Sequence, residues 1–319
     1  MNWLIASLLL AAQDLPYRTL PAHAQGTTQV RTTADGKLLL TTGIPDRTVK
    51  VWLLSTGKVL HTLGEQAEFF SLRPDGGLAA VGESARTTVW NLTTGQRIHG
   101  LDSGRTVALG WSPDGKTLTT IGLKGEKGKA GVLEARIWDL PAAESRKPVL
   151  VPLSKVPSSL AVSPSGTQLA VPHWEGGLRT WDLAKDRVEL QLPGGPVGRV
   201  VWSPDGRTLA LSSGGALRFV EASSGKEVHQ MVGSGAEFSP DGAHVAVSVE
   251  AGIEVWKTGT WTRLEATYGG PGTGVWIPES LELSGDGRSL LAGGTLVAKD
   301  APAAGRLSGP VYFWKLRVR

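Results

Sequence analysis

Few residues of this chain combine the types and the spacing that enzyme chemistry requires. The sequence contains no cysteine, so disulfides, zinc fingers and thiol nucleophiles are excluded. The sequence patterns of zinc peptidases, serine hydrolases and EF-hand calcium loops are also missing. The stretch GEKGKAG at residues 125–131 approaches a phosphate-binding loop, but Ala130 stands where that loop places a serine or threonine on magnesium. We therefore interpret this stretch as a flexible loop and expect no cofactor and no metal.

Isolated carboxylates and histidines could act together only if the fold gathered them. Glu134, Glu175 and Glu282 lie far apart in the sequence, and two carboxylates serve as acid and base only when they face one reacting group. Three histidines occupy the same position in different sequence repeats and so cannot converge on one ion, namely His61, His99 and His229. Any chemistry therefore depends on the elements that carry these side chains.

Composition indicates a β-rich globular chain with many turns. Of its 319 residues, 40% are hydrophobic and 19% are charged, and there are 42 glycines and 19 prolines. This mixture favours many short strands over long helices. The net charge is +4, with lysine and arginine dispersed along the chain, whereas nucleic-acid-binding surfaces concentrate basic and aromatic residues. We expect no nucleic-acid partner.

Two sequence markers recur together seven times, roughly every forty residues. The first is a turn dipeptide followed by an apolar stretch, at Asp35-Gly36, Asp75-Gly76, Asp114-Gly115, Ser165-Gly166, Asp205-Gly206, Asp241-Gly242 and Asp286-Gly287. The second is an alternating strand that ends in an aromatic residue, at Trp52, Trp90, Trp138, Trp181, Phe219, Trp256 and Trp314. Turns such as STGK and SSGK then lead into another strand, so each unit contains four short strands.

The S-P-D-G turns and the Trp-Asp-Leu endings at residues 138–140 and 181–183 resemble those of the WD-repeat β-propeller family, in the style of its bacterial members. The resemblance covers residues 16–319 and implies an all-β, seven-bladed propeller of four-stranded antiparallel blades. It also implies a buried, hydrogen-bonded tetrad in the first repeat, formed by His23, Thr42, Asp46 and Trp52. Only two repeats carry Trp-Asp, so we expect the other blades to depend more on apolar packing.

The N-terminal segment is expected to close the ring. The last repeat ends after its third strand, and residues 13–25 resemble the outer strands of other repeats. They would complete the last blade, within a single propeller domain spanning residues 13–319. Residues 1–12 form a candidate signal peptide or an apolar tail, too short for a transmembrane span. If residues 1–12 are a signal peptide, we expect cleavage near Ala12, because cleavage after Ala24 would remove the closing strand. A signal peptide would also favour export of the protein over a cytoplasmic location.

Departures from the repeat mark a candidate docking face. Residues 122–134 and 293–309 are insertions between a second and a third strand, which the family resemblance places on one face of the ring. Trp174 and Trp276 fall outside the repeat positions and map to that face, although either indole could instead close over a neighbouring blade. The candidate partner-binding residues are His173, Trp174, Glu175, Trp276, Lys124, Lys127, Lys129, Lys299 and Arg306.

Two functions remain open from the sequence. The first is a monomeric, non-catalytic scaffold that presents its loop-rich face to a protein or peptide. The alternative is an enzyme of the propeller hydrolase or lactonase type, with its site at the mouth of the central channel. A channel cluster of carboxylates and histidine would favour the enzyme.

Overall fold

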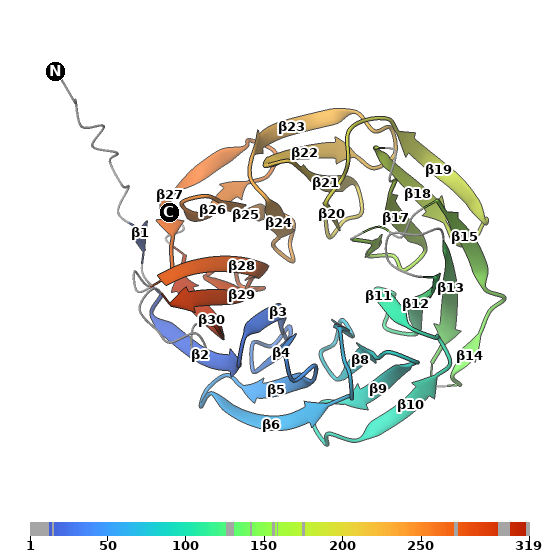
Figure 1. The fold of residues 1–319 in the computed structure, drawn as a ribbon, viewed down its shortest axis with the longest axis horizontal. Helices are drawn as coiled ribbons and strands as arrows, with labels where there is room; N and C mark the ends of the chain where they lie inside the picture. The colour runs from blue at the N-terminus through green and yellow to red at the C-terminus, as the bar shows by residue number, and fades with distance from the viewer. Residues whose placement is uncertain are drawn as a thin grey trace.

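The chain folds into a ring of seven β-sheets around an open centre (Figure 1). The computed structural model describes residues 13–14, 16–125, 131–140, 142–154, 157, 159–173, 176–270, 274–298 and 307–316. In these residues every regular element is a β-strand, and none of them forms a helix long and apolar enough to cross a membrane. The predicted all-β, seven-bladed propeller is confirmed.

The first three blades follow one another along the chain, and the strands of each run antiparallel from the channel to the rim. Blade 1 contains β3 (Gly26–Thr32), β4 (Leu38–Ile44), β5 (Val49–Leu53) and β6 (Lys58–Leu63). Blade 2 contains β7 (Phe69–Leu72), β8 (Leu78–Gly82), β9 (Thr87–Asn91) and β10 (Arg97–Leu101). Blade 3 contains β11 (Thr106–Trp111), β12 (Thr117–Gly125) and β13 (Gly131–Asp139), whose rim side pairs with β14 (Glu144–Ser145) and β15 (Val149–Leu153).

The remaining blades complete the ring. Blade 4 contains β16 (Ala161–Val162), β17 (Gln168–Pro172), β18 (Leu178–Asp182) and β19 (Arg187–Leu192). Blade 5 contains β20 (Arg199–Trp202), β21 (Thr208–Ser213), β22 (Ala216–Glu221) and β23 (Glu227–Val232). Blade 6 contains β24 (Gly235–Phe238), β25 (His244–Val249), β26 (Gly252–Lys257) and β27 (Thr262–Tyr268). Blade 7 contains β28 (Gly274–Leu283), β29 (Ser289–Ala298), β30 (Leu307–Lys315) and the N-terminal β2 (Arg18–His23).

The repeated Ser-Pro-Asp-Gly segment is a tight turn between an inner strand and the second strand of its blade. Ser203 Oγ donates to Asp205 Oδ1 at 2.6 Å, and the backbone N–H of Thr208 donates to Ser203 Oγ at 2.9 Å. Gly206 has a φ of 70°, a conformation that glycine adopts at little cost. The same hydroxyl–carboxylate bond recurs at residues 112–114, 239–241 and 284–286. These serines and aspartates therefore shape turns.

The aromatic residue of the third strand marks a fixed register position. Trp52 lies opposite Leu39 of the second strand. In blade 5 the equivalent residue is Val220, opposite Leu209, so the sequence-based choice of Phe219 is wrong by one residue. Because successive strand residues point to opposite faces of a sheet, Phe219 packs into the other side of blade 5, where it is fully buried.

The N-terminal segment closes the ring, as predicted, with a shorter strand than residues 13–25. Within β2, Arg18 lies opposite Phe313 and His23 lies opposite Gly309 of β30. The preceding β1 (Gln13–Asp14) pairs in parallel with β27 of blade 6 instead. Leu20 is buried in the core between blades 7 and 1. The N-terminal residues thus attach to two blades and leave no open edge on β30.

A buried hydrogen-bonded cluster joins this closing strand to blade 1. His23 Nδ1 lies 2.9 Å from Asp46 Oδ1, and its Nε2 lies 3.0 Å from Thr41 Oγ1. Trp52 Nε1 donates to the same Thr41 hydroxyl at 2.9 Å. The hydroxyl residue is therefore Thr41 and not the predicted Thr42, because Thr42 points to the opposite face of β4. The other three predicted members lie in the cluster.

Burial sets the protonation of this cluster. It lowers the pKa of His23 below its ordinary value, although the hydrogen bond and the charge of Asp46 act in the opposite direction. Burial raises the pKa of Asp46, but hydrogen bonds from Lys50 and His23 outweigh it and leave that pKa below its ordinary value. The resulting cluster at neutral pH is an uncharged imidazole beside an ionised carboxylate.

Removing the N-terminal strands tests the ring closure. We expect a chain that begins at Gln25 to be less stable than one that begins at Gln13 by about 3 kcal/mol or more, because Leu20 leaves the core. The exposed edge of β30 should also make the shorter chain self-associate. Thermal unfolding and analytical ultracentrifugation measure both effects. The closure would be contradicted if the two chains unfolded at the same midpoint temperature and both remained monomeric.

Substitution at neighbouring threonines tests the cluster. Thr41→Val should lower the free energy of unfolding by about 1–3 kcal/mol, because it leaves the Trp52 indole N–H and a His23 ring nitrogen without their partner. Thr42→Val removes a hydroxyl of the same strand from the other face and serves as the matched control. Chemical denaturation measures both variants. A loss at Thr42 as large as at Thr41 would argue against the observed arrangement.

Candidate functional site

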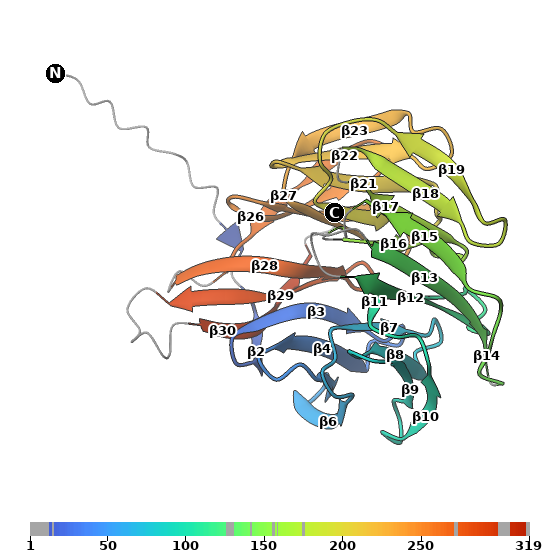
Figure 2. The ribbon, with the colours of Figure 1, turned by 45° about the vertical axis from the view of Figure 1, so that its right-hand side comes forward.

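Two elongated hairpins lie on one face of the ring. Inner strands begin at this face and end at the Ser-Pro-Asp-Gly turns, so the connections between second and third strands return to it. β12 and β13 lengthen the hairpin of blade 3, while β29 and β30 lengthen that of blade 7. Figure 2 shows β28, β29 and β30 reaching outward past the neighbouring strands. We call this side of the ring the loop-rich face.

The long hairpin of blade 3 is covered by its own chain. β15 pairs with the half of β13 nearest the loop. Leu123 and Leu133 on this hairpin are only 9% and 0% exposed, and they share a core cluster with Val151 of β15. The hairpin itself therefore offers little apolar surface to a partner, and Leu150 of the paired β15 is the exposed aliphatic side chain beside it.

Lys124 is the one described lysine among the predicted docking residues of blade 3. It forms an ion pair with Glu134, and Arg136 Nε donates to the same carboxylate at 2.6 Å. The hydrogen bond from Lys124, together with that from Arg136, lowers the pKa of Glu134. Several other predicted docking residues lie outside the described residues, namely Lys127, Lys129, Trp174, Glu175, Lys299 and Arg306.

The long hairpin of blade 7 leaves one side uncovered. We call residues 274–279, 293–298 and 307–309 the blade-7 extension. Ile277 lies opposite Thr295, and Leu307 lies opposite Val297 two residues further along β29, so all four side chains point to the same side. On this side, which faces blade 1, Ile277 is 52% and Leu307 45% exposed. Exposed aliphatic side chains thus stand on a projecting sheet.

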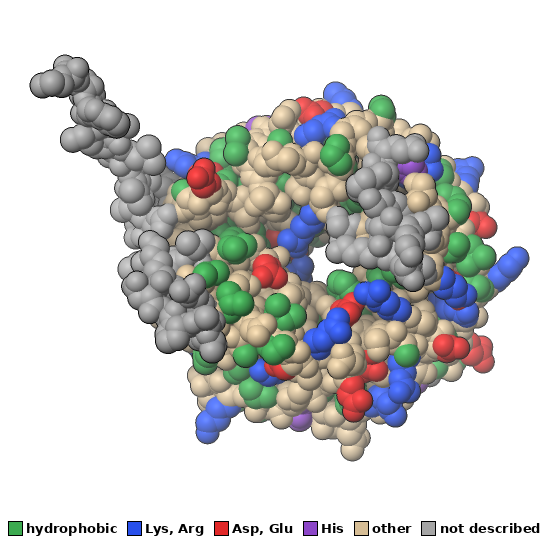
Figure 3. Space-filling model, in the orientation of Figure 1, with side chains coloured by type: hydrophobic (Ala, Val, Ile, Leu, Met, Phe, Trp, Pro, Cys, Tyr) green, Lys and Arg blue, Asp and Glu red, His purple; other side chains and the backbone are tan. Residues whose placement is uncertain are grey.

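Blade 1 lies next to this uncovered side of the blade-7 extension. A Cβ atom added at Gly26 would lie 2.6 Å from Thr295 Oγ1 and 3.4 Å from Ile44 Cγ1, so glycine is needed for the two blades to approach so closely. Ile44 is itself 42% exposed. Figure 3 shows hydrophobic side chains gathered at the lower left of the channel, over blades 7 and 1. We call Ile44, Ile277, Val297 and Leu307 the apolar step.

Trp276 does not belong to the docking surface that the sequence predicted. It precedes Ile277 and so points to the opposite side of the extension, toward blade 6. Its ring packs edge-on against Tyr312, with centroids 5.1 Å apart, and tilts against Trp314 at 5.7 Å. The indole therefore covers the core between blades 6 and 7. His173 is half-buried, and its backbone N–H donates to the carbonyl of Gly177.

A cavity of about 720 Å³ occupies the centre of the ring and is lined by residues from the inner strands. Charged side chains on its wall cluster around Glu237. Arg31 Nη2 lies 2.6 Å from Glu237 Oε1, and Arg199 Nη2 lies 3.9 Å from Glu237 Oε2. Figure 3 shows the open channel with basic side chains on its wall. The channel is therefore neither purely apolar nor purely acidic.

The structure does not bring Glu134 and Glu282 together. Glu282 accepts hydrogen bonds from Thr32 N at 2.7 Å and Thr32 Oγ1 at 2.8 Å, which join blade 7 to blade 1. Burial raises its pKa, although Arg31 acts in the opposite direction. Glu134 instead pairs with its own hairpin in blade 3, and Glu175 lies outside the described residues. Across the described part of the chain, no three His, Asp or Glu side chains gather as a metal site.

Sequence reasoning missed both the apolar step and the charged channel cluster. Arg31 and Glu237 are separated by 206 residues and sit in different blades, so spacing gives no hint of their contact. The register of the seven repeats was the available signal, because it places both residues on inner strands. For Ile277 the signal was its position one residue after Trp276 on a lengthened strand.

Comparison with protein families matches the WD domain, G-beta repeat (WD40), over residues 15–52, a stretch that runs from the N-terminal segment through most of blade 1. The U3 small nucleolar RNA-associated protein 4 homolog of Homo sapiens is 25% identical over 185 residues, covering 52% of this chain and 26% of that protein. The Protein LST8 homolog of Drosophila melanogaster is 26% identical over 197 residues, covering 56% and 57%. Small ribosomal subunit protein RACK1y of Oryza sativa subsp. japonica is 28% identical over 156 residues, covering 46% and 44%.

The chain spans less than two thirds of the length of each of these relatives. They come from an animal, an insect and a plant, so they give no support to a bacterial style of repeat. The fold and the repeat are those of WD40-repeat β-propellers, and residues 15–52 match the model of that repeat.

Proposed function

We propose that this chain is a non-catalytic scaffold that holds a protein partner on its loop-rich face, with the apolar step as the centre of contact. WD40 propellers commonly bind proteins, which supports an interaction role in general. Two of the relatives carry names that place them with larger assemblies, a small ribosomal subunit and the U3 small nucleolar RNA. These names do not identify the partner of this chain, so we infer the chemistry of the partner from the surface of the protein.

The observation that carries this proposal is the contrast between the two long hairpins. In blade 3 the aliphatic side chains of the hairpin pack into a core cluster with β15 and blade 4, leaving Leu133 at 0% exposure, although Leu150 of β15 is 55% exposed. In blade 7 the equivalent extension keeps Ile277 at 52% exposure. Apolar surface that projects from a sheet costs solvation free energy unless a partner covers it. The step therefore suits a partner that contributes its own apolar side chains.

The predicted docking residues divide between two parts of the ring. By sequence position, Lys299 and Arg306 fall between β29 and β30, whereas His173, Trp174, Glu175, Lys124, Lys127 and Lys129 belong to blades 3 and 4, across the channel from blade 7 (Figure 1). Charged groups at the rim of an interface steer association and add specificity more than affinity. We propose that Lys299 and Arg306 flank the apolar contact and that the residues of blades 3 and 4 meet a more distant part of the same partner. A partner with an apolar anchor and flanking charges matches this arrangement.

Paired surface substitutions test the docking site. The double variant Ile277→Asp, Leu307→Asp should weaken capture of the partner from extracts of the source cell by about tenfold or more, because charge enters an apolar contact. Its stability should stay within about 0.5 kcal/mol, because both side chains are exposed. Quantitative affinity purification with mass spectrometry compares the two proteins.

A matched control addresses non-specific adhesion. Val188 and Val228 on the outer strands are 38% and 39% exposed, and the variant Val188→Asp, Val228→Asp places the same charges on the rim. This control should retain the partner that the blade-7 variant loses. Equal loss from both variants, or full capture by the blade-7 variant, would contradict docking at the apolar step.

We also propose that the protein is exported after cleavage near Ala12. β1 begins at Gln13, so this cleavage would leave both N-terminal strands in place, whereas cleavage after Ala24 would remove them. Edman sequencing or mass spectrometry of the protein from its native cell should give Gln13 as the first residue. An uncleaved Met1, or a start after Ala24, would contradict the proposal.

A further inference from the structure

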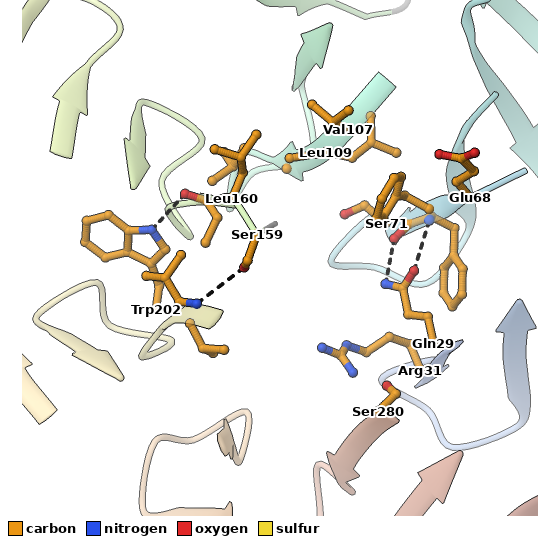
Figure 4. Close-up of a pocket in the computed structure, with 18 of the residues that line it drawn as sticks. Gln29, Arg31, Glu68, Ser71, Val107, Leu109, Ser159, Leu160, Trp202 and Ser280 are labelled. Carbon is orange, nitrogen blue, oxygen red and sulfur yellow. Dashed lines mark hydrogen bonds between the residues drawn. The ribbon is translucent and has the colours of Figure 1, made fainter. Parts of the chain in front are cut away.

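Apolar side chains are unevenly distributed around the central channel. Blades 2 to 5 contribute apolar side chains that are at least partly exposed to the channel, namely Phe69, Val107, Leu109, Leu160 and Val201. Polar side chains, including Glu68, Ser71, Arg105 and Ser159, lie among them. The opposite wall, from blades 5, 6, 7 and 1, is polar and includes Gln29, Arg31, Arg199, Glu237 and Ser280. Figure 4 shows Arg31 and Ser280 across the opening from Val107 and Leu109.

The polar wall holds two guanidinium groups beside one carboxylate. Arg31 is fixed on several sides, because Nη2 pairs with Glu237 at 2.6 Å and Nη1 donates to the carbonyls of Val30 and Leu281 at 2.8 and 3.1 Å. Arg199 Nη1 donates to the carbonyl of Glu279 at 3.1 Å, whereas its Nη2 stays 3.9 Å from Glu237, beyond hydrogen-bond distance. The side chain of Arg199 is 37% exposed.

The other carboxylates in and around the channel are engaged elsewhere. Glu279 accepts from Thr295 Oγ1 at 2.6 Å, and Glu68 pairs with Arg47 and with Arg105. Glu282 accepts two hydrogen bonds from Thr32. Burial and the neighbouring charge of Arg31 lower the pKa of Arg199, against the effect of Glu237. The positive charge of Arg199 is therefore incompletely balanced.

We propose that the channel binds a small organic acid with an apolar body, whose carboxylate pairs with Arg199 and whose body packs against Val107, Leu109 and Leu160. A guanidinium matches a carboxylate through two parallel hydrogen bonds. Glu237 beside it favours a single negative charge over a phosphate dianion. The cavity of about 720 Å³ has the size of ligand pockets in general. This site is independent of the apolar step on blade 7.

Calorimetric titration of the full chain with octanoate tests the site. Octanoate should bind about tenfold or more tightly than octan-1-ol, octylammonium or acetate, because only octanoate offers both the anion and the apolar body. Arg199→Met, which keeps an unbranched apolar stem and removes the guanidinium, should weaken octanoate by about tenfold and leave octan-1-ol unchanged. Leu109→Asn should weaken octanoate from the opposite wall. Arg199→Lys keeps the charge but loses the paired hydrogen bonds, so it should bind octanoate with an affinity between those of the wild type and of Arg199→Met.

Every other outcome overturns the proposal. Equal binding of octanoate and octan-1-ol would reduce the site to an apolar cavity, and equal binding of acetate would reduce it to an anion contact. Tighter binding of N-acetyl-leucine than of octanoate would assign the site to a peptide carboxyl end. Absence of binding, or wild-type binding by both Arg199→Met and Leu109→Asn, would also refute it. The Ile277→Asp, Leu307→Asp variant should bind octanoate normally, which separates this site from docking.

Discussion

The pairing of β2 with β30 is the contact on which the rest of this molecule depends. A four-stranded sheet cannot bury both of its faces alone, and a ring of seven sheets does so only if its first and last members meet. Here the last blade takes its outer strand from the N terminus. The same strand brings His23 to Asp46 of blade 1. Closure therefore joins blades 7 and 1 through backbone pairing and buried polar contacts together.

Blade 7 combines this structural role with the surface that we propose for docking. Its strands β28 to β30 continue past the ring, and the same sheet that is anchored by β2 presents the apolar step. Thr27 Oγ1 of blade 1 donates to the carbonyl of Gly309 at 2.7 Å, at the foot of the extension. A projecting sheet held on several sides is rigid, and a rigid surface loses little conformational entropy on binding.

The sequence predicts the blade architecture well, but it predicts poorly toward which face of a sheet a single side chain points. Seven recurring turns and third strands suffice for the number and order of blades, because every unit repeats the same chemistry. Three errors share one cause: Thr42 for Thr41, Phe219 for Val220, and Trp276 where its neighbour Ile277 is exposed. Adjacent strand residues point to opposite faces, so a shift of one residue exchanges core and surface. The channel cluster escaped prediction because Arg31 and Glu237 meet only after seven blades close.

The most direct measurement of the central claim is hydrogen–deuterium exchange of the full chain, alone and with its captured partner. We expect slow exchange along β2 and β30 in both states, because ring closure opens only with global unfolding. We also expect partner-dependent protection at residues 276–279 and 294–297 of the blade-7 extension. Fast exchange of β2 in the free protein, or protection confined to the outer strands of other blades, would contradict the claim.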